Sequence, residues 1–307
     1  MATEILYDCD PGHDDAIALV MAHRSADIDL SAVTTVCGNA TLERTHANAR
    51  RILRLIGSTA PVYRGCAAPL ARELVLGTAD GPSGLDGSTY LPDPGEEITT
   101  EHAIDYLARR LMAAPAPMTV VATGPLTNLG MLLLKYPQAA ARIGKLISMG
   151  GAFWRRDDTI TPTEFNIFCD PEAAQIVFDS GVDVTMVGLD VTMKVLVEAP
   201  QFAALEKIDT ELARVVHDWL KFYEKLHRGQ MGIGGALHDP LAMALVIDPT
   251  LVRTRPAHVA INFTSGPMFG ATVADFWGER GLPDNVHVAS EVDADRFFEL
   301  LWHLLRD

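Results

Sequence analysis

Short apolar runs alternate along the chain with longer segments whose apolar residues recur at helical spacing. The first run, residues 4–10 (EILYDCD), predicts a strand. The next, residues 30–36 (LSAVTTV), is followed by a helical pattern over residues 41–55 that stops before Gly57. Alternating strands and helices are typical of βαβ units on a parallel sheet. The pattern therefore predicts an α/β fold with an open, mostly parallel central sheet flanked by helices.

The same pattern predicts the remaining elements. Further strands are expected at residues 118–122, 145–150, 183–188, 258–263, 271–276 and 285–290. Helices are expected to begin near Asp14 and to fill residues 100–113, 126–135, 171–180, 211–226, 239–246 and 293–305. No internal repeat and no Ser- or Pro-rich linker divides the 307 residues, so we expect a single domain.

Two glycine-rich segments, residues 77–97 and 228–239, are expected to be loops. Long glycine-rich loops in a compact domain often cover a substrate, although a solvated connection is nearly as common. The second contains GIGG, but it lacks the GK[ST] ending of a phosphate-binding loop and no strand precedes it. A phosphate site is therefore not predicted there.

Composition and charge narrow the class of protein. Hydrophobic residues make up 48% and charged residues 21%, as in globular proteins. Forty acidic against 25 basic residues leave a net charge of -15, which disfavours nucleic acid or an anionic membrane as partner and favours a small neutral or cationic molecule. No signal-like segment and no apolar run of roughly 18 residues is evident, so a cytoplasmic location is expected. The four cysteines form no CxxC pair, which predicts reduced thiols.

Four carboxylates crowd into residues 7–19 (YDCDPGHDDAIAL), namely Asp8, Asp10, Asp14 and Asp15. If a strand ends and a helix begins here, they lie at the carboxyl edge of the sheet, where open α/β folds bind ligands. Asp14 and Asp15 could simply cap the helix, but capping explains Asp10 poorly. Converging carboxylates raise one another's pKa unless a cation lies among them, and an all-oxygen set selects a hard ion such as Ca²⁺ or Mg²⁺. A divalent cation is therefore predicted.

The spacing of these acids is not that of an EF-hand, so more oxygen ligands must come from elsewhere in the chain. In VVATGPLTNLG the carbonyl of Thr123 ends a predicted strand and is expected at the same sheet edge. In TPTEFNIFCDPEAA, Glu164 and Asn166 are expected on one side of an extended segment. His238 and Asp239, in ALHDPLAMAL, precede another predicted helix.

In two of these stretches an aspartate could serve only as the N-cap of a helix. Asp170 stands before Pro171 and predicts an ordinary helix N-cap. Asp239 stands before Pro240 in the same way, so its local sequence alone favours a cap.

Six segments together resemble the nucleoside hydrolases (nucleoside N-ribohydrolases). They are DCDPGHDDAIAL, VCGNATLERTHANA, TGPLTNL, SMGGAF, TEFNIFCDPEAA and HDPLAMA, in this order over nearly the whole chain. The resemblance implies a single domain, residues 1–307, with a Rossmann-like nucleoside hydrolase fold, assembled as a homodimer or homotetramer. It also implies hydrolysis of the N-glycosidic bond of a ribonucleoside to ribose and free base.

The resemblance also implies site residues, by the positions that match its motifs. One Ca²⁺ per subunit would be held by the carboxylates of Asp10, Asp15 and Asp239 and by the carbonyl of Thr123. Asp10 would also be the general base that activates a water, and His238 is the better candidate for a catalytic contact to the leaving base. The substrate would be bound by a further set. Asp14, Asn39 and Asn166, helped by Asp239, would take the 2′- and 3′-hydroxyls, and Glu164 and Met149 would face the 5′-hydroxyl.

The chemistry agrees with this arrangement. When the base leaves C1′, oxocarbenium character develops, so a cluster of anionic oxygens stabilises the transition state more than the neutral substrate. Asp8 has no implied role and is expected to be structural.

The sequence departs from the family pattern at positions expected to contact the base and the 5′-hydroxyl of the substrate. Asp80 stands where many members carry a histidine, and a carboxylate could protonate a base only if burial raised its pKa. Thr159 or Asp158 falls where members often have an asparagine for the 5′-hydroxyl. An aromatic wall for the base could come from Trp219, Phe222 and Tyr223, but their helical spacing favours core packing.

Two other functions stay open. Asp8-x-Asp10 suggests a haloacid-dehalogenase-type phosphohydrolase, but Gly12 stands where that family wants Thr or Val, and no phosphate-binding lysine is evident. A nucleoside- or ribose-binding protein without catalysis would have no need for a water-activating carboxylate.

Overall fold

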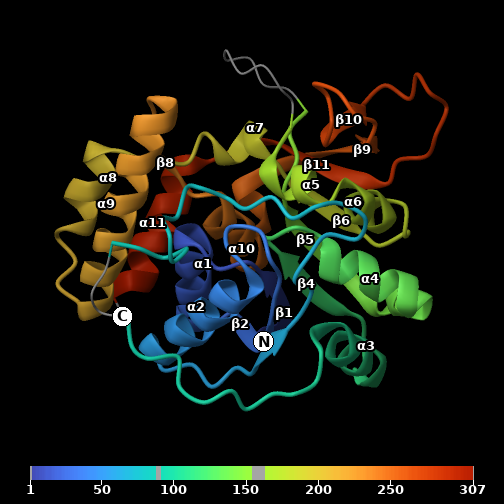
Figure 1. Cartoon of the computed structure of the whole chain (residues 1–307). Helices are drawn as coiled ribbons and strands as arrows, with labels where there is room; N and C mark the ends of the chain where they lie inside the picture. Colours follow the sequence, from blue (N-terminus) through green and yellow to red (C-terminus); the bar gives the residue numbers. More distant parts are fainter. Residues whose placement is uncertain (1, 88–90, 154–162, 307) are drawn as a thin grey trace.

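The computed structural model describes residues 2–87, 91–153 and 163–306 (Figure 1). Strand β1 (Thr3–Cys9) lies inside the sheet between β2 (Ile28–Thr35) and β4 (Met118–Ala122). The other strands of this sheet are β3 (Val62–Arg64), β5 (Ile143–Met149), β6 (Val184–Val187), β9 (Val252–Asn262), β10 (Ala271–Asp275) and β11 (Val286–Val292). Within the described residues the order is β10-β9-β11-β6-β5-β4-β1-β2-β3.

Every neighbouring pair from β3 to β11 is parallel, and β9 pairs antiparallel with both β11 and β10. The predicted mostly parallel α/β sheet is therefore confirmed. A separate antiparallel pair joins β7 (Leu196–Val197) to β8 (Gly235–Ala236).

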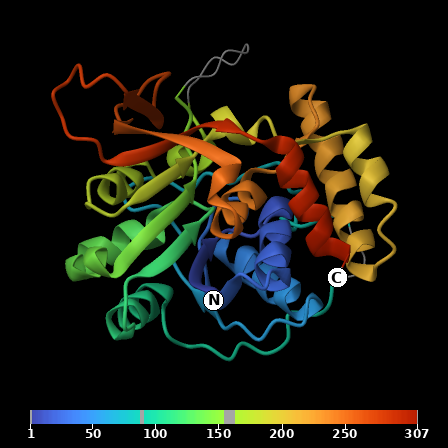
Figure 2. The same cartoon turned by 180° about the vertical axis from the view of Figure 1, so that it is seen from behind.

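Helices cover both faces of the sheet (Figure 2). One face carries α1 (His13–Arg24), α2 (Leu42–Leu55), α10 (His238–Ile247) and α11 (Ala294–Arg306). The other carries α3 (Ala103–Ala113), α4 (Thr127–Lys135) and α6 (Pro171–Phe178). Helices α8 (Ala199–Leu205) and α9 (Glu211–Met231) pack beside α11 at one end of the molecule (Figure 1). The short elements are α5 (Phe165–Cys169), α7 (Leu189–Thr192), η1 (Pro137–Arg142) and η2 (Pro249–Leu251).

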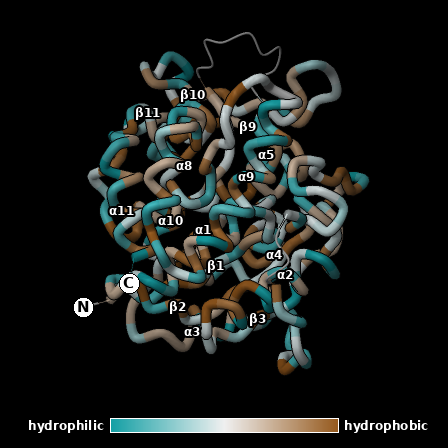
Figure 3. Tube along the Cα trace, turned by 90° about the vertical axis from the view of Figure 1, so that its left-hand side faces the viewer, coloured by the Kyte–Doolittle hydropathy of each residue, from teal (hydrophilic) through white to brown (hydrophobic). Residues whose placement is uncertain are grey.

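Each face of the sheet has its own apolar core, because side chains along a strand alternate between faces. In β1, Ile5 and Tyr7 are buried against the α1 side, whereas Leu6 is buried on the α4 side. The trace coloured by hydropathy has many apolar segments in the interior of the molecule and many hydrophilic ones at its periphery (Figure 3). Within the described residues, no helix is both long and apolar enough to cross a membrane.

Helix α9 runs five residues beyond the predicted end at residue 226. It begins at Thr210, whose hydroxyl accepts the N–H of Ala213, and it ends at Gly232, where φ is 72°. Only glycine adopts this left-handed conformation without strain, so Gly232 rather than Gly229 ends the helix. The prediction of a long loop over residues 228–239 was therefore wrong, since α9, β8 and the start of α10 fill most of it.

The strand order places the expected ligand site. From β1 the chain builds outward through β2 to β3, and it then crosses back to add β4 on the other side of β1. A crevice forms where the strand order reverses, outside the carboxyl ends of the two strands. Asp10 follows the end of β1 and Thr123 follows the end of β4, so both lie at this switch point.

Candidate active site

A cavity of about 310 Å³ lies at this edge of the sheet. Most of the predicted site residues line it: Asp14, Asn39, Thr123, Met149, Glu164, Asn166, His238 and Asp239. Asp10 and Asp15 are fully buried and are not part of its lining. The structure thus brings together residues that are more than 200 positions apart in the sequence.

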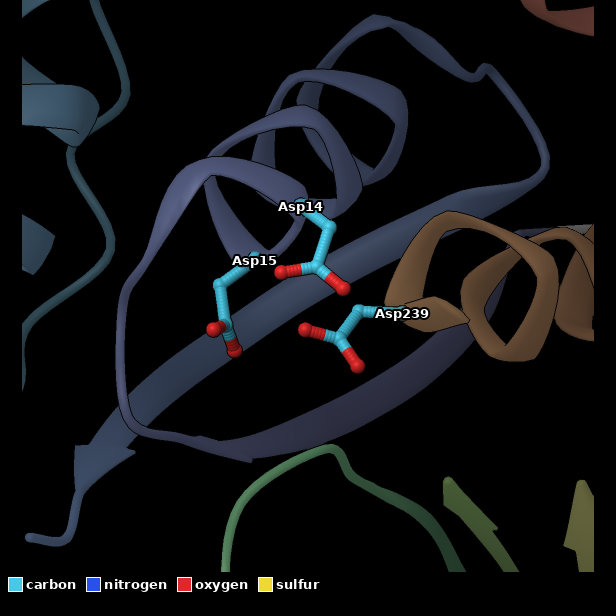
Figure 4. A group of neighbouring side chains, drawn as sticks. All are labelled: Asp14, Asp15 and Asp239. Atoms are coloured by element: carbon cyan, nitrogen blue, oxygen red, sulfur yellow. The ribbon is translucent and has the colours of Figure 1, made fainter. Parts of the chain in front are cut away.

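Three carboxylates converge beside the cavity, and two of them, Asp14 and Asp239, line it. Asp14 and Asp15 project from the first turn of α1 and Asp239 from the first turn of α10, and the three point toward one another (Figure 4). One oxygen from each lies within 4.8 Å of the others. The N-caps of the two helices are Gly12 and Leu237, so Asp239 is not a helix cap and its capping prediction was wrong.

Asp15 is held by four donors. Its Oδ1 lies 2.8 Å from the Thr123 hydroxyl and 3.3 Å from the Tyr7 hydroxyl. Its Oδ2 accepts the backbone N–H of Gly12 at 3.1 Å and the side-chain amide of Asn39 at 3.3 Å. These contacts join the ends of β1 and β4 to α1 and fix the carboxylate in one orientation.

Asp10 is a neighbour of this group of three, since, besides burial, the charges of Asp15 and Asp14 contribute to raising its pKa. Its Oδ2 accepts the backbone N–H of Asn39 at 2.7 Å, whereas Oδ1 is buried without a hydrogen-bond partner in the described part of the chain. Two glycines enclose the carboxylate. A Cβ added to Gly38 would lie 2.1 Å from Oδ2, and one added to Gly124 would lie 2.8 Å from Oδ1. Only glycine leaves room for the carboxylate at these two positions.

The electrostatics of the cluster favour a bound cation. Burial, and then the charge of neighbouring carboxylates, raises the pKa of Asp10, Asp14 and Asp239 well above the usual range. Buried carboxylates that repel one another, together with an unpartnered oxygen on Asp10, form an all-oxygen donor set. Such a set fits a hard divalent ion.

Glu164 and Asn166 do not lie on an extended segment, so that prediction was wrong. Glu164 is the N-cap of α5, and its carboxylate accepts the backbone N–H groups of Asn166, Ile167 and Gly151 at 2.9–3.2 Å. This capping starts the helix. The Asn166 amide donates to the carbonyl of Thr123 at 2.7 Å and to that of Met149 at 3.3 Å, which joins α5 to the sheet edge.

Histidine and tyrosine side chains also line the cavity. Tyr223 is buried, as expected, but it lines the cavity as well, whereas Trp219 is fully buried in the core. Phe222 stacks on His13 with the ring centroids 5.3 Å apart. The Nδ1 of His238 lies 2.8 Å from the Thr192 hydroxyl, which orients its ring.

Asp80 and His227 also line the cavity. The Oδ1 of Asp80 accepts the backbone N–H of His13 at 2.9 Å and lies 2.6 Å from His13 Nδ1, so this carboxylate is tied to the start of α1. His227 was not predicted. The sequence feature that could have pointed to His227 is its position one helical turn after Tyr223, which puts both side chains on one face of a helix. Asp158 and Thr159 lie outside the described residues.

Three predictions about supporting residues are in agreement with the structure. Asp8 is buried and accepts hydrogen bonds from Thr34 and Asn128, which is consistent with a structural role. Asp170 is the N-cap of α6 and accepts the N–H of Ala173 at 3.0 Å. The four cysteines are free thiols.

Comparison with known proteins identifies the family of this chain. The sequence model of the inosine-uridine preferring nucleoside hydrolases matches residues 5–299. The chain is 41% identical over 306 residues to the pyrimidine-specific ribonucleoside hydrolase RihA of Photobacterium profundum, covering 98% of each chain. It is 38% identical over 305 residues to RihA of Escherichia coli, covering 98% of this chain and 97% of that one.

Solved structures show the same relationship. The plant nucleoside hydrolase PpNRh1 superposes with a TM-score of 0.90 at 32% identity, over 100% of this chain and 99% of the other. A purine-preferring ribonucleoside hydrolase from Gardnerella vaginalis gives 0.88 at 31% identity, over 99% of both. The chain therefore belongs to the inosine-uridine preferring nucleoside hydrolase family, enzymes that hydrolyse the N-glycosidic bond of ribonucleosides.

Proposed function

We propose that this chain hydrolyses pyrimidine ribonucleosides, uridine and cytidine, to ribose and free base, with one bound Ca²⁺ per subunit. The observation that carries the proposal is the convergence of Asp14, Asp15 and Asp239 in a cavity at the switch point of the sheet. The choice of pyrimidines is supported by relatives that are named pyrimidine-specific and are 38–41% identical over nearly the whole chain.

The ion is held by the carboxylates of Asp10, Asp15 and Asp239 and by the Thr123 carbonyl. Two observations support this set: the pKa values of these buried carboxylates are raised, and Oδ1 of Asp10 has no partner among the described residues. A cation would stabilise the ionised carboxylates and would give Oδ1 a partner. When bound, Ca²⁺ supplies Lewis acidity toward water and the ribose hydroxyls.

The residues of the chain bind and polarise the substrate. Asp14, Asn39 and Asn166, helped by Asp239, take the 2′- and 3′-hydroxyls, and Glu164 and Met149 face the 5′-hydroxyl. The amide nitrogen of Asn166 already donates to the Thr123 and Met149 carbonyls, which leaves its oxygen as an acceptor for a ribose hydroxyl.

Proton transfer is assigned to two residues. Asp10 accepts a proton from the water that attacks C1′, and its Oδ1 is available because it has no partner in the described part of the protein. The C1′–N bond breaks with its electron pair moving to the base, and His238 donates a proton to the base as it leaves. The carboxylates stabilise the positive charge that develops on the ribose ring.

A substrate panel tests the proposal. The protein is incubated with uridine, cytidine, inosine and adenosine, in Ca²⁺ or after removal of metal with EDTA, and released ribose is measured as reducing sugar. We expect ribose from the pyrimidine nucleosides only, and only with Ca²⁺. Faster release from purine nucleosides would refute the base preference. Binding without turnover would indicate a binding protein, and phosphate release from sugar phosphates would indicate a phosphohydrolase.

A variant tests the general base. Asp10→Asn keeps the acceptor for the Asn39 N–H but cannot take a proton, so kcat should fall by about 10²–10³, as for other removed electrostatic groups. Asp8→Asn, two residues away, is the matched control and should stay within about threefold of the wild type. Near-normal turnover of Asp10→Asn would rule out its role as base.

We also propose a homodimer or homotetramer. Light scattering on the purified protein measures the assembled mass, and a monomer of 33.3 kDa would refute this.

A further inference from the structure

One tyrosine hydroxyl contacts the carboxylate cluster without lining the cavity. Tyr7 lies on β1, and its side chain is fully buried in the core on the α1 side of the sheet. A ring without a hydroxyl would fill the same space, and a buried hydroxyl is costly unless it is hydrogen-bonded. The hydroxyl of Tyr7 meets Asp15 and Thr123, two of the residues proposed to hold the cation.

The side chains of Tyr7, Thr123 and Asp15 form a closed triangle of polar contacts. The Thr123 hydroxyl oxygen lies 2.8 Å from the Tyr7 hydroxyl oxygen and 2.8 Å from Asp15 Oδ1. The third side, from the Tyr7 hydroxyl oxygen to the same Oδ1, is 3.3 Å. All three side chains are buried, so bulk water does not compete for these contacts.

The number of protons limits how this triangle is bonded. Tyr7 and Thr123 supply one hydroxyl proton each for three contacts. If both protons pointed at Oδ1, the 2.8 Å contact between the two hydroxyl oxygens would contain no hydrogen. The two hydroxyls are therefore hydrogen-bonded to each other, and only one of them at a time donates to Oδ1. Donation from Tyr7 to Thr123 and from Thr123 to Asp15 uses the two shorter contacts.

This pairing leaves Asp15 able to bind a cation. A carboxylate has about four lone-pair sites. Oδ2 already accepts two N–H groups, one from Gly12 and one from Asn39. Two hydroxyl donors on Oδ1 would occupy the remaining sites, whereas a single donor leaves one of them for an ion. The bond between Tyr7 and Thr123 thus fixes the carboxylate without filling it.

We propose that Tyr7 is a positioning residue of the cation site. Its hydroxyl, bonded to that of Thr123, holds the Asp15 carboxylate and the Thr123 backbone in the orientation that binds the ion. The inference rests on the proposed function, since it takes Asp15 and the Thr123 carbonyl as ligands of Ca²⁺. Groups that hydrogen-bond metal ligands orient them, and their loss typically costs about 10- to 100-fold in metal affinity or activity.

Calcium binding to the metal-free protein tests the proposal. Metal is removed with EDTA, the protein is dialysed, and the Kd for Ca²⁺ is measured by isothermal titration calorimetry. Tyr7→Phe removes only the hydroxyl and keeps the buried ring. Tyr136→Phe is the matched control, because the Tyr136 hydroxyl also donates to an aspartate, Asp105 Oδ1 at 2.7 Å, but on the other face of the sheet.

We expect Tyr7→Phe to raise the Kd for Ca²⁺ by about tenfold or more and Tyr136→Phe to leave it within about twofold. The rate of uridine hydrolysis by Tyr7→Phe should fall when the Ca²⁺ concentration is near the wild-type Kd. It should return to within about threefold of the wild type at saturating Ca²⁺, because mass action restores occupancy. Should Tyr7→Phe fail to fold, Thr123→Val removes the other hydroxyl of the pair, keeps the carbonyl and should raise the Kd by a similar factor.

Two outcomes would overturn the inference in a wild-type protein that binds Ca²⁺. One is a Kd of Tyr7→Phe within about twofold of the wild type, with or without a lower unfolding temperature, which would make Tyr7 a residue of the core alone. The other is a loss of activity that saturating Ca²⁺ does not restore, which would mean that Tyr7 acts on the chemistry rather than on the ion. If the wild-type protein binds no Ca²⁺, the proposed ion fails, and the inference fails with it.

Discussion

Substitution of Asp8 tests whether this acidic residue has a structural role, in contrast to the catalytic and binding roles proposed for Asp10, Asp14 and Asp15. Its side chain is 1% exposed, and Oδ1 accepts the Thr34 hydroxyl at 2.5 Å and the Asn128 amide at 2.7 Å. Burial is the main cause that raises its pKa from 3.8 to about 6. We predict that Asp8→Asn stays within about threefold of wild-type activity and removes a pH-dependent loss of stability.

The size of this effect follows from the two pKa values. Because the folded pKa is raised above the unfolded value, the stability that Asp8 contributes is fully present below pH 3.8 and is lost as pH rises through about 6. At about 1.4 kcal/mol per pKa unit, the total is about 3 kcal/mol. Of this, about 1.3 kcal/mol is lost between pH 5 and pH 7. Asparagine keeps the acceptor Oδ1 but does not ionise, so the variant should gain that amount relative to the wild type.

Urea unfolding of both proteins at pH 5, 6 and 7, with EDTA present, measures this difference. Asp209→Asn is the matched control, because the Asp209 side chain is 91% exposed and should show no such trend. A difference between Asp8→Asn and the wild type that does not change with pH would refute the reasoning. A loss of activity as large as that expected for Asp10→Asn would instead place Asp8 in the chemistry.

Gly38→Ala should lower kcat more than about tenfold, because its Cβ would lie 2.1 Å from Asp10 Oδ2 and displace the proposed base. Gly229→Ala, whose Cβ meets nothing within 4 Å, should leave steady-state kinetics unchanged. Asp239→Asn should stabilise the metal-free protein at pH 7 by removing one of several repelling carboxylates, and should abolish any rise in unfolding temperature that Ca²⁺ gives the wild type in calorimetry. His46→Gln should remove a loss of stability on acidification from about pH 6.5 to 4, since burial lowers the pKa of His46 to about 4 and the unfolded chain binds the proton first; urea unfolding over this range measures it.

The sequence predicted most of the long, periodic elements of the fold to within a few residues, because each buries an apolar stripe. The exception is β9, predicted from residue 258 but beginning at Val252, because residues 253–256 are exposed and carry no apolar pattern. The sequence missed the short elements for a physical reason. The three residues of β3 carry no period of their own and form a strand by pairing with β2. Helix α5 has five residues and depends on the Glu164 carboxylate that accepts the N–H groups of Asn166 and Ile167. Such a contact leaves no periodic pattern in the sequence.

At the site, the end of β1 and the start of α1 predicted that the acids of residues 8–15 lie at the carboxyl edge of the sheet, and the structure has them there. That Asp239 meets Asp14 and Asp15 was expected only from the family resemblance, because the strand before it, β8, lies outside the main sheet. The sequence did not predict that the backbones of Gly38 and Gly124 approach the Asp10 carboxylate from two loops far apart in the chain. Close backbone approach of this kind is a tertiary property.

The cavity residues of α9 show why part of the site could not be predicted from the sequence. The residues proposed for ribose and metal mostly follow a strand or begin a helix, so their position is set by the sheet edge and can be argued from the sequence. His227 and Tyr223 are instead turned toward the cavity by the way α9 packs, and the helical period that places them together also suits a core. Among the described residues the buried Nδ1 of His227 has no hydrogen-bond partner, and that is a property of the folded chain. The positions of the residues proposed for ribose and metal therefore follow from the strands, whereas the cavity residues of α9 depend on how that helix packs.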